Sequence, residues 1–154
     1  MINTTGKSLL MTAMLLLASC TSGERPRAAE VIAPAPAYED FGDLRVHYNV
    51  MPTLAMNESM AREVGIERDD GRAMIMVALR KLANGEELAV EGEVKAVAVD
   101  LQGLRQPISF TAVRTGEYTD YIGSFRIVER DSYRFDITVK AGGRSGEVKF
   151  QRNF

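Results

Sequence analysis

The stretch SYRFDITVK, residues 132–140, shows most directly how this chain folds, because apolar and polar side chains alternate along its whole length. Every second residue from Tyr133 to Val139 is large and apolar, and the residues between them are charged or hydroxylic. A period of two is typical of a β-strand with one face on a core and the other in water. The stretch therefore predicts a strand of an antiparallel sheet with one exposed face.

The same period recurs on both sides of this stretch, starting at Phe41. We expect a first strand near Phe41 and six more over residues 72–82, 92–101, 107–114, 118–128, 132–140 and 147–154. Turn-forming pairs such as Asn84-Gly85 and Gly142-Gly143 separate the strands. About seven short strands at this spacing predict an all-β domain, an antiparallel immunoglobulin-like β-sandwich.

One segment between the first two predicted strands carries the signals of a short helix. Asn57 is a good N-cap, Glu58 places an acid in the first turn, and Gly65 suits the C-terminal stop. Met60 and Val64 are four residues apart and so fall on one face of that helix. We therefore expect a short helix that crosses between the first and second strands.

The first twenty residues, MINTTGKSLLMTAMLLLASC, have the features of an export signal. Lys7 supplies a positive charge, and the apolar run that follows has about half of the ~20 residues that a helix needs to span a bilayer. The run ends in Leu17-Ala18-Ser19-Cys20, which resembles the lipobox of bacterial lipoprotein precursors. We therefore predict cleavage before Cys20 and acylation of Cys20.

The alternative is an ordinary secretory signal followed by an unmodified cysteine. Cys20 is the only cysteine of the chain, so it cannot form an internal disulfide and needs another explanation. Acyl chains on Cys20 would hold the mature protein firmly at a membrane, since each buried methylene contributes ~0.8 kcal/mol. Thr21 follows the cysteine, which is similar to the pattern of lipoproteins sorted to the outer membrane, and we expect the protein there, facing the periplasm.

These signals divide the chain into a signal peptide over residues 1–19, a lipidated cysteine with a flexible tether over residues 20–38, and a β-sandwich domain over residues 39–154. The tether is rich in proline and alanine, which favours an extended segment without packing of its own; the alternative is that residues 31–37 lie along the domain surface. The net charge of −2 and the pI near 5.5 argue against nucleic-acid binding, which needs a basic surface.

Five segments of the domain together suggest a known family. They are FGDLRVHYN at 41–49, VGI at 64–66, RAMI at 72–75, RFDI at 134–137 and KFQRNF at 149–154. In combination they resemble the bacterial domain of unknown function 4426 family, over about residues 39–154. The resemblance implies a small exported bacterial protein and supplies no catalytic residues. Many members of that family carry a plain signal peptide, so the lipobox would be a variation of this chain.

The domain has few candidate catalytic or metal-ligating residues. The chain has a single histidine, His47, and no serine in a Gly-x-Ser-x-Gly turn, so we expect neither a nucleophilic enzyme nor a cofactor. A metal site is the alternative, because His47, Met51, Met56 and Met60 fall within fourteen positions, and thioethers with imidazole suit Cu(I). The competing interpretation is that the methionines fill gaps in a core and that His47 is simply solvated.

A noncatalytic role in binding or assembling another envelope protein fits these observations best. Small sandwiches outside the cytoplasm often hold a partner at a sheet edge or at one loop end. The last predicted strand, which ends at Phe154, could lie at such an edge. The alternative function is a copper-binding envelope protein that uses His47 and the nearby methionines.

Overall fold

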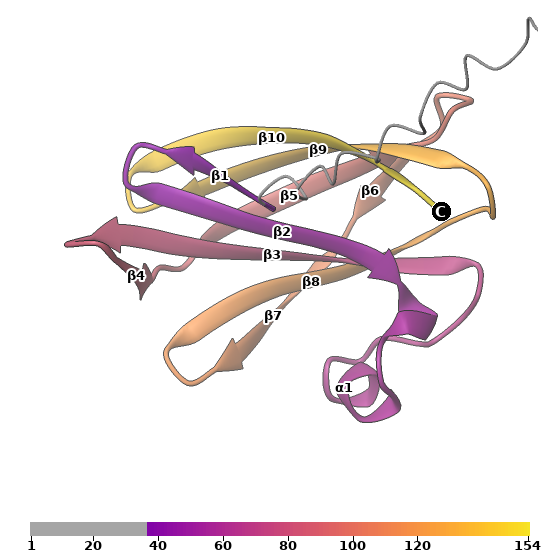
Figure 1. Ribbon diagram of the computed structural model, residues 1–154, viewed down its shortest axis with the longest axis horizontal. Helices are drawn as coiled ribbons and strands as arrows, with labels where there is room; N and C mark the ends of the chain where they lie inside the picture. Colours follow the sequence, from indigo (N-terminus) through magenta and orange to yellow (C-terminus); the bar gives the residue numbers. More distant parts are fainter. Residues whose placement is uncertain (1–36) are drawn as a thin grey trace, which may run out of the picture. The chain divides into compact units, whose positions relative to one another are not determined.

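The computed structural model describes residues 37–154 of the protein (Figure 1). Its elements run in the order β1 (Tyr38–Phe41), β2 (Leu44–Pro52), η1 (Thr53–Ala55), α1 (Glu58–Glu63), β3 (Arg72–Ala83), β4 (Glu86–Ala89), β5 (Gly92–Val99), β6 (Arg105–Ile108), β7 (Phe110–Thr115), β8 (Tyr118–Arg126), β9 (Ser132–Ala141) and β10 (Arg144–Asn153). The predicted signal peptide, Cys20 and nearly all of the predicted tether lie outside the described residues. Within residues 37–154, no helix has the length and apolar character needed to cross a membrane.

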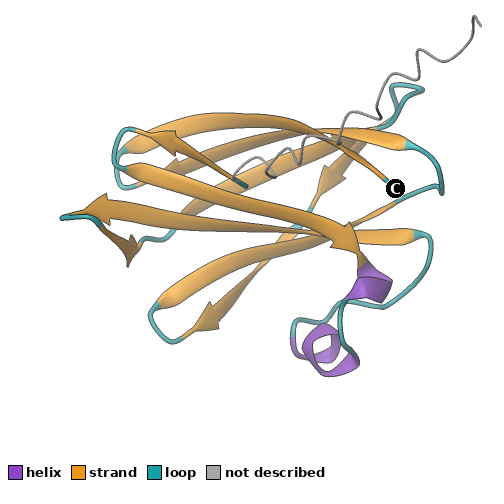
Figure 2. Cartoon of the chain, in the orientation of Figure 1, coloured by secondary structure: helices purple, strands orange, loops and turns teal. Residues whose placement is uncertain are grey.

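The strands form two antiparallel sheets that pack face to face, with α1 beside one of them (Figure 2). The first sheet has the order β1-β2-β3-β8-β7, with β4 paired to the end of β3, and the second sheet has the order β10-β9-β5-β6. The predicted all-β sandwich is therefore confirmed. The described part of the chain has ten strands instead of about seven, and α1 follows the second strand instead of the first.

The predicted strand 107–114 is in fact two strands in different sheets. Ser109 separates β6 from β7, and at this residue the chain crosses from the second sheet to the first. The Gln106 side chain accepts from the Arg126 amide and donates to the Arg126 carbonyl, each at 3.1 Å, and so fixes the start of the crossing. Gly123 of β8 leaves room for it, because a Cβ there would lie 2.5 Å from the Ile108 side chain.

The core lies between the sheets and follows the alternation seen in the sequence. Tyr133, Phe135, Ile137 and Val139 of β9 are each at most 1% exposed, and burying such a side chain contributes about 1.5–3 kcal/mol. Phe135 stacks on Phe150 of β10 with ring centroids 4.8 Å apart. The period of two therefore assigned the inner face of this strand correctly.

Two hairpins have the tight turns that the sequence predicts. Asn84 and Gly85, between β3 and β4, have φ values of 54° and 81°, and Gly142 and Gly143, between β9 and β10, have 56° and 77°. Positive φ at both central residues is typical of the two-residue turn whose twist matches the flanking strands. The second turn sets Ala141 opposite Arg144 and thereby the register of the β9–β10 pair.

The helix α1 begins as predicted, but it buries a different face. The Asn57 side chain accepts a hydrogen bond from the amide of Met60 at 2.8 Å, and Gly65 follows the helix with a φ of 70°. Ala61 is buried and Val64 is half-buried, whereas Met60 is 52% exposed. Met60 therefore does not fill a gap in the core, which was the competing interpretation of the methionines, because Ala61 is the residue of α1 that faces the sheet.

Candidate functional site

The outer face of the first sheet carries most of the residues that the sequence singles out. Val46 of β2 lies opposite Leu79 of β3, and both are fully buried on the inner face. Successive side chains of a strand point to opposite faces, so His47 and, four residues on, Met51 face outward. This outer face has a polar half near the β3–β4 hairpin and an apolar half under α1.

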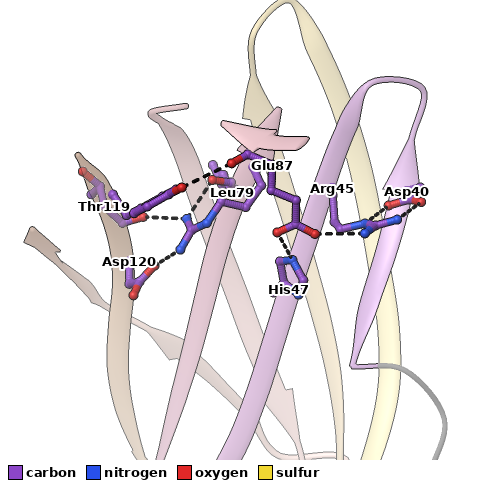
Figure 3. A network of polar contacts seen from close by, with 9 residues as sticks. Asp40, Arg45, His47, Leu79, Glu87, Thr119 and Asp120 are labelled. Atoms are coloured by element: carbon purple, nitrogen blue, oxygen red, sulfur yellow. Dashed lines mark hydrogen bonds and ion pairs between the residues drawn. The ribbon is translucent and has the colours of Figure 1, made fainter. Parts of the chain in front are cut away.

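A network of charged side chains occupies the polar half (Figure 3). Arg45 of β2 donates to Glu87 of β4 at 2.9 Å and to both carboxylate oxygens of Asp40 of β1, at 2.7 and 2.9 Å. The guanidinium carbon also lies 4.0 Å from the ring centroid of Tyr38. The second Glu87 oxygen is 2.9 Å from Nε2 of His47. Arg45 is therefore satisfied by two carboxylates and an aromatic face, which leaves it poorly suited to bind an external anion.

The two carboxylates of this network are held in their ionised form. Hydrogen bonds from Arg45 lower the pKa of Asp40 from its ordinary value of 3.8. Partial burial works to raise the pKa of Glu87, but hydrogen bonds from Arg45 and His47 outweigh it and bring this pKa below 4.5. Asp40 and Glu87 are thus ion-pair partners at neutral pH and poor general acids.

A second ion pair extends the polar half to β8. Arg80 of β3 donates to Asp120 at 2.8 Å, and its guanidinium carbon lies 4.6 Å from the ring centroid of Tyr118. The Tyr118 hydroxyl donates to the backbone carbonyl of Glu87 at 3.3 Å. Polar contacts therefore tie β1, β2, β3, β4 and β8 together across the sheet (Figure 3). In residues 37–154, no three His, Cys, Asp or Glu side chains are grouped so that they could hold a metal ion.

The apolar half is a small cluster that α1 and η1 cover. We call the four side chains Met51, Met56, Met74 and Met76 the methionine cluster. Met56 and Met74 are each 4% exposed, and Met51 and Met76 are half-buried. Their apolar neighbours are Ala61, Val64, Ile66, Val113 and Ile122. The thioethers thus form a second core on the outer face, apart from the main core between the sheets.

The structure brings together only two of the four predicted copper ligands, Met51 and Met56. His47 is four residues from Met51 along β2, which is about 13 Å at the rise of a strand, and it is bonded to Glu87. Met60 is largely exposed and is not part of the cluster. The predicted lipidation site, Cys20, lies outside the described residues.

The sequence reasoning missed Met74 and Met76, which complete the cluster from β3. Both belong to the segment RAMIMVAL, residues 72–79, whose two apolar faces are visible in the sequence. An outward apolar face in a sheet needs a cover, and the helix that begins after Asn57 supplies it. The cross-strand register that sets Met74 opposite Met51 was not readable from spacing alone.

Strand β10 forms one edge of the second sheet, where the sequence analysis expected the last strand to lie. Arg144 and Ala141 flank the two-residue turn, so they form a hydrogen-bonded pair. Bonded and non-bonded pairs alternate along an antiparallel ladder. Even-numbered residues of β10 therefore bond to β9, and the backbone groups of the odd-numbered residues point away from the sheet; these are Ser145, Glu147, Lys149, Gln151 and Asn153.

The start of this edge is covered by the end of β1 and by the β1–β2 turn. Arg144 donates to Asp43 at 2.7 Å. The ring of Phe41 lies so close to Gly146 that a Cβ there would come within 2.5 Å of it. Beyond this point, no strand of the described residues pairs with the outer side of β10. The open part of the edge therefore runs over residues 147–153.

Comparisons with known proteins cover this same domain. The family described as "Domain of unknown function (DUF4426)" matches residues 38–154. A crystal structure of a DUF4426 family protein from Pseudomonas aeruginosa PAO1 is similar, with 29% sequence identity and a TM-score of 0.64, over 76% of this chain and 92% of that chain. No curated protein matches the sequence. The matched range begins and ends with the ten-strand sandwich.

Proposed function

The chain belongs to the DUF4426 family through its β-sandwich domain, residues 38–154, and from this premise we propose that the domain is a noncatalytic module that binds an extended strand of an envelope protein. The observation that carries the proposal is the open edge of β10 over residues 147–153. Exposed edge strands are templates for a further strand, whose main-chain hydrogen bonds provide affinity while side chains provide specificity.

The other sheet edges of the described domain are less suited to this role. Strands β1, β4 and β6 have four residues each, and β7 has six, whereas β10 has ten. Strand β6 also contains Pro107, which has no amide hydrogen to donate. Short length and proline are common ways of blocking an edge. Among the edge strands of residues 37–154, only β10 offers a long and regular ladder.

Side chains beside the open amides would select the partner. Glu147, Lys149 and Gln151 are on the solvent face of the second sheet, and Glu147 and Lys149 form an exposed ion pair at 3.2 Å that a partner strand would have to replace. Opposite charges across a strand pair contribute roughly 0.2–1 kcal/mol, and like charges oppose pairing. The partner strand should therefore carry a basic residue beside Glu147 and an acidic residue beside Lys149.

We further propose that the domain works at the outer membrane, anchored by acyl chains on Cys20. The lipobox-like sequence before Cys20 supports this part of the proposal. The seventeen residues between Cys20 and β1, 21–37, could extend over roughly 55 Å. The partner would then be an envelope protein within that distance of the membrane. A second candidate function, binding of a soft metal, is favoured by the methionine cluster and is argued in the next subsection.

Site-specific crosslinking in cells tests strand addition. A photoreactive phenylalanine analogue replaces Glu147 or Lys149 at the open edge, and Lys95 in an otherwise identical control. Lys95 is also exposed on the second sheet but belongs to β5, which pairs with the other side of β9 and so lies away from the open edge of β10. We expect the same crosslinked protein from both edge positions and none of it from Lys95. Equal yields from all three positions would contradict the proposal.

A proline substitution then separates strand pairing from side-chain contact. The amide of Lys149 points away from β9, so Lys149→Pro removes an outward donor without removing a bond of the β9–β10 ladder. Lys149→Gln keeps the donor and loses only the charge. Crosslinking from position 147 should vanish in the proline variant and persist in the glutamine variant, with similar thermal unfolding of both. Persistence in both folded variants would exclude strand addition at this edge.

A further inference from the structure

We propose that the methionine cluster binds a soft monovalent metal ion, Cu(I), through the thioethers of Met51, Met74 and Met76, with Met56 covering the ion. The sulfur of a thioether is a soft ligand that favours Cu(I) over harder divalent ions. The proposal goes beyond strand addition and does not depend on it, because the cluster lies on the outer face of the first sheet and the open edge belongs to the second.

The register of β2 and β3 brings three thioethers to one point. Met51 lies directly opposite Met74, so their Cβ atoms are about 4.5–5.5 Å apart. Met76 is two residues farther along β3, on the same face, and its Cβ is diagonal to that of Met51 at about 7–8 Å. A methionine side chain has three rotatable bonds. Three sulfur atoms can therefore converge above the sheet between the two strands.

The fourth thioether comes from the segment that crosses over the sheet. Met56 follows η1 directly, is 4% exposed and belongs to the same cluster as Met74 and Ala61 of α1. Its place is fixed by a backbone hydrogen bond of 3.1 Å from its amide to the carbonyl of Thr53. Met56 is thus positioned to close the site from the side opposite the sheet.

The distribution of methionine argues against simple gap filling. All five methionines of residues 37–154 lie between positions 51 and 76, and four of them are in the cluster. In the part of the chain that the structure describes, the larger core between the sheets contains no methionine; its side chains are those of Val, Ile, Leu, Ala, Phe and Tyr. Methionine as a general filler of irregular gaps would be expected in both cores.

The border of the cluster gives an ion a way in. Met51 and Met76 are half-buried, and the exposed Asn49 lies opposite Met76. Thioethers are neutral, so the bound ion keeps its positive charge. Burying an uncompensated charge completely would be costly, and a position at this half-exposed border reduces that cost.

The test is a competition for Cu(I) between the full-length protein, purified in detergent, and the chromogenic chelator bicinchoninate under anaerobic, reducing conditions. Cys20→Ala serves as the background, because a thiol that escaped acylation would itself bind Cu(I). Met51→Leu, Met74→Leu and Met76→Leu conserve volume and apolar character. Each should weaken Cu(I) binding at least tenfold, and X-ray absorption of the parent complex should show sulfur as the only neighbouring ligand atom.

Met60→Leu and His47→Ala are the matched controls, since neither residue belongs to the cluster. Both should retain the affinity of the parent protein. Failure of the parent to remove Cu(I) from bicinchoninate would overturn the proposal, and so would unchanged affinity in the three cluster variants. An equal loss in Met60→Leu would also overturn it, by showing binding without a defined site. Thermal unfolding of each variant verifies that a lost affinity is not a lost fold.

Discussion

The phenolic oxygen of Tyr121 engages both backbone polar groups of Gly92, donating to the carbonyl oxygen at 2.7 Å and accepting from the amide at 2.9 Å. Tyr121 belongs to β8 of the first sheet, and Gly92 is the first residue of β5 in the second sheet. A Cβ at position 92 would lie 2.2 Å from the carbonyl oxygen of Lys140. Glycine therefore lets β5 begin close against β9, where one hydroxyl joins the two sheets.

Removing this hydroxyl should destabilise the domain. Tyr121→Phe leaves a partly buried amide and carbonyl without their partner, which costs about 1–3 kcal/mol. Urea unfolding measures the loss. Tyr118→Phe is the control, because its hydroxyl makes a longer, exposed contact of 3.3 Å, and its change should stay within about 0.5 kcal/mol. Equal effects of the two variants would show that the bridge between the sheets adds nothing.

Gly146 should tolerate a side chain only when Phe41 is shortened. A Cβ at position 146 would lie 2.5 Å from the Phe41 ring, so Gly146→Ala should cost about 1–3 kcal/mol. In a Phe41→Ala background the same substitution should cost much less, because the clashing ring is gone. A double-mutant cycle measured by denaturant unfolding gives the coupling. Additive free energies would mean that Phe41 does not restrict this position.

The charged network should make stability depend on pH in the acidic range. The pKa values of Asp40 and Glu87 in the folded protein are below their ordinary values of 3.8 and 4.5. As the pH falls, Asp40 and Glu87 take up protons in the unfolded chain before they do so in the folded protein. The network therefore stabilises the fold fully above the ordinary pKa values of these two carboxyl groups and progressively less below them. Glu87→Gln should therefore lower the free energy of unfolding by about 0.2–1 kcal/mol at neutral pH.

The difference between the parent protein and Glu87→Gln should begin to shrink as the pH falls below 4.5, the ordinary pKa of Glu87, and should vanish once the folded carboxylate is protonated as well. Unfolding curves at several pH values measure it. The exposed neighbour Glu86 provides the control, and Glu86→Gln should change stability by less than about 0.5 kcal/mol at every pH. A difference for Glu87→Gln that grows on acidification would contradict the sign of the effect.

Intact mass of the protein purified from membranes tests the anchor. We expect a chain that begins at Cys20 and carries added acyl mass, and we expect that mass to be absent from Cys20→Ala. Acyl chains contribute ~0.8 kcal/mol per buried methylene, so the parent protein should stay with the membrane fraction and the variant should not. An unacylated chain cut at another position would contradict the predicted anchor and would indicate a freely diffusing protein.

Alternation predicted the long strands well because each has one buried and one solvated face. Strand β9 was predicted at 132–140 and spans Ser132–Ala141. Strands β1 and β4 were missed, since four residues hardly show a period. The merging of β6 with β7 has another cause. The alternation of apolar and polar residues shows which face of a sheet a side chain occupies, but it does not show to which sheet the strand belongs. At Ser109 the chain passes from the second sheet to the first while the alternation continues.

The candidate sites divide in the same way. The edge position of β10 was anticipated from its place at the end of the predicted strands, and the cap at Asn57 was read correctly from the sequence. Grouping His47 with three methionines by nearness in sequence gave two cluster members and two residues that lie elsewhere. Met74 comes from a strand more than twenty residues away, and only the β2–β3 register places it against Met51.

The attachment of β1 to β2 also determines how the domain would respond to force. Strand β1 starts at Tyr38, opposite His47 in the middle of β2, and ends at Phe41, opposite Leu44. A force applied through residue 37 would separate these residue pairs one after another, in the unzipping geometry, instead of breaking all of them at once in shear. The contact of Tyr38 with Arg45 would yield early and the packing of Phe41 on Gly146 last. Under tension the four residues of β1 would thus detach and extend before the core of the domain is exposed.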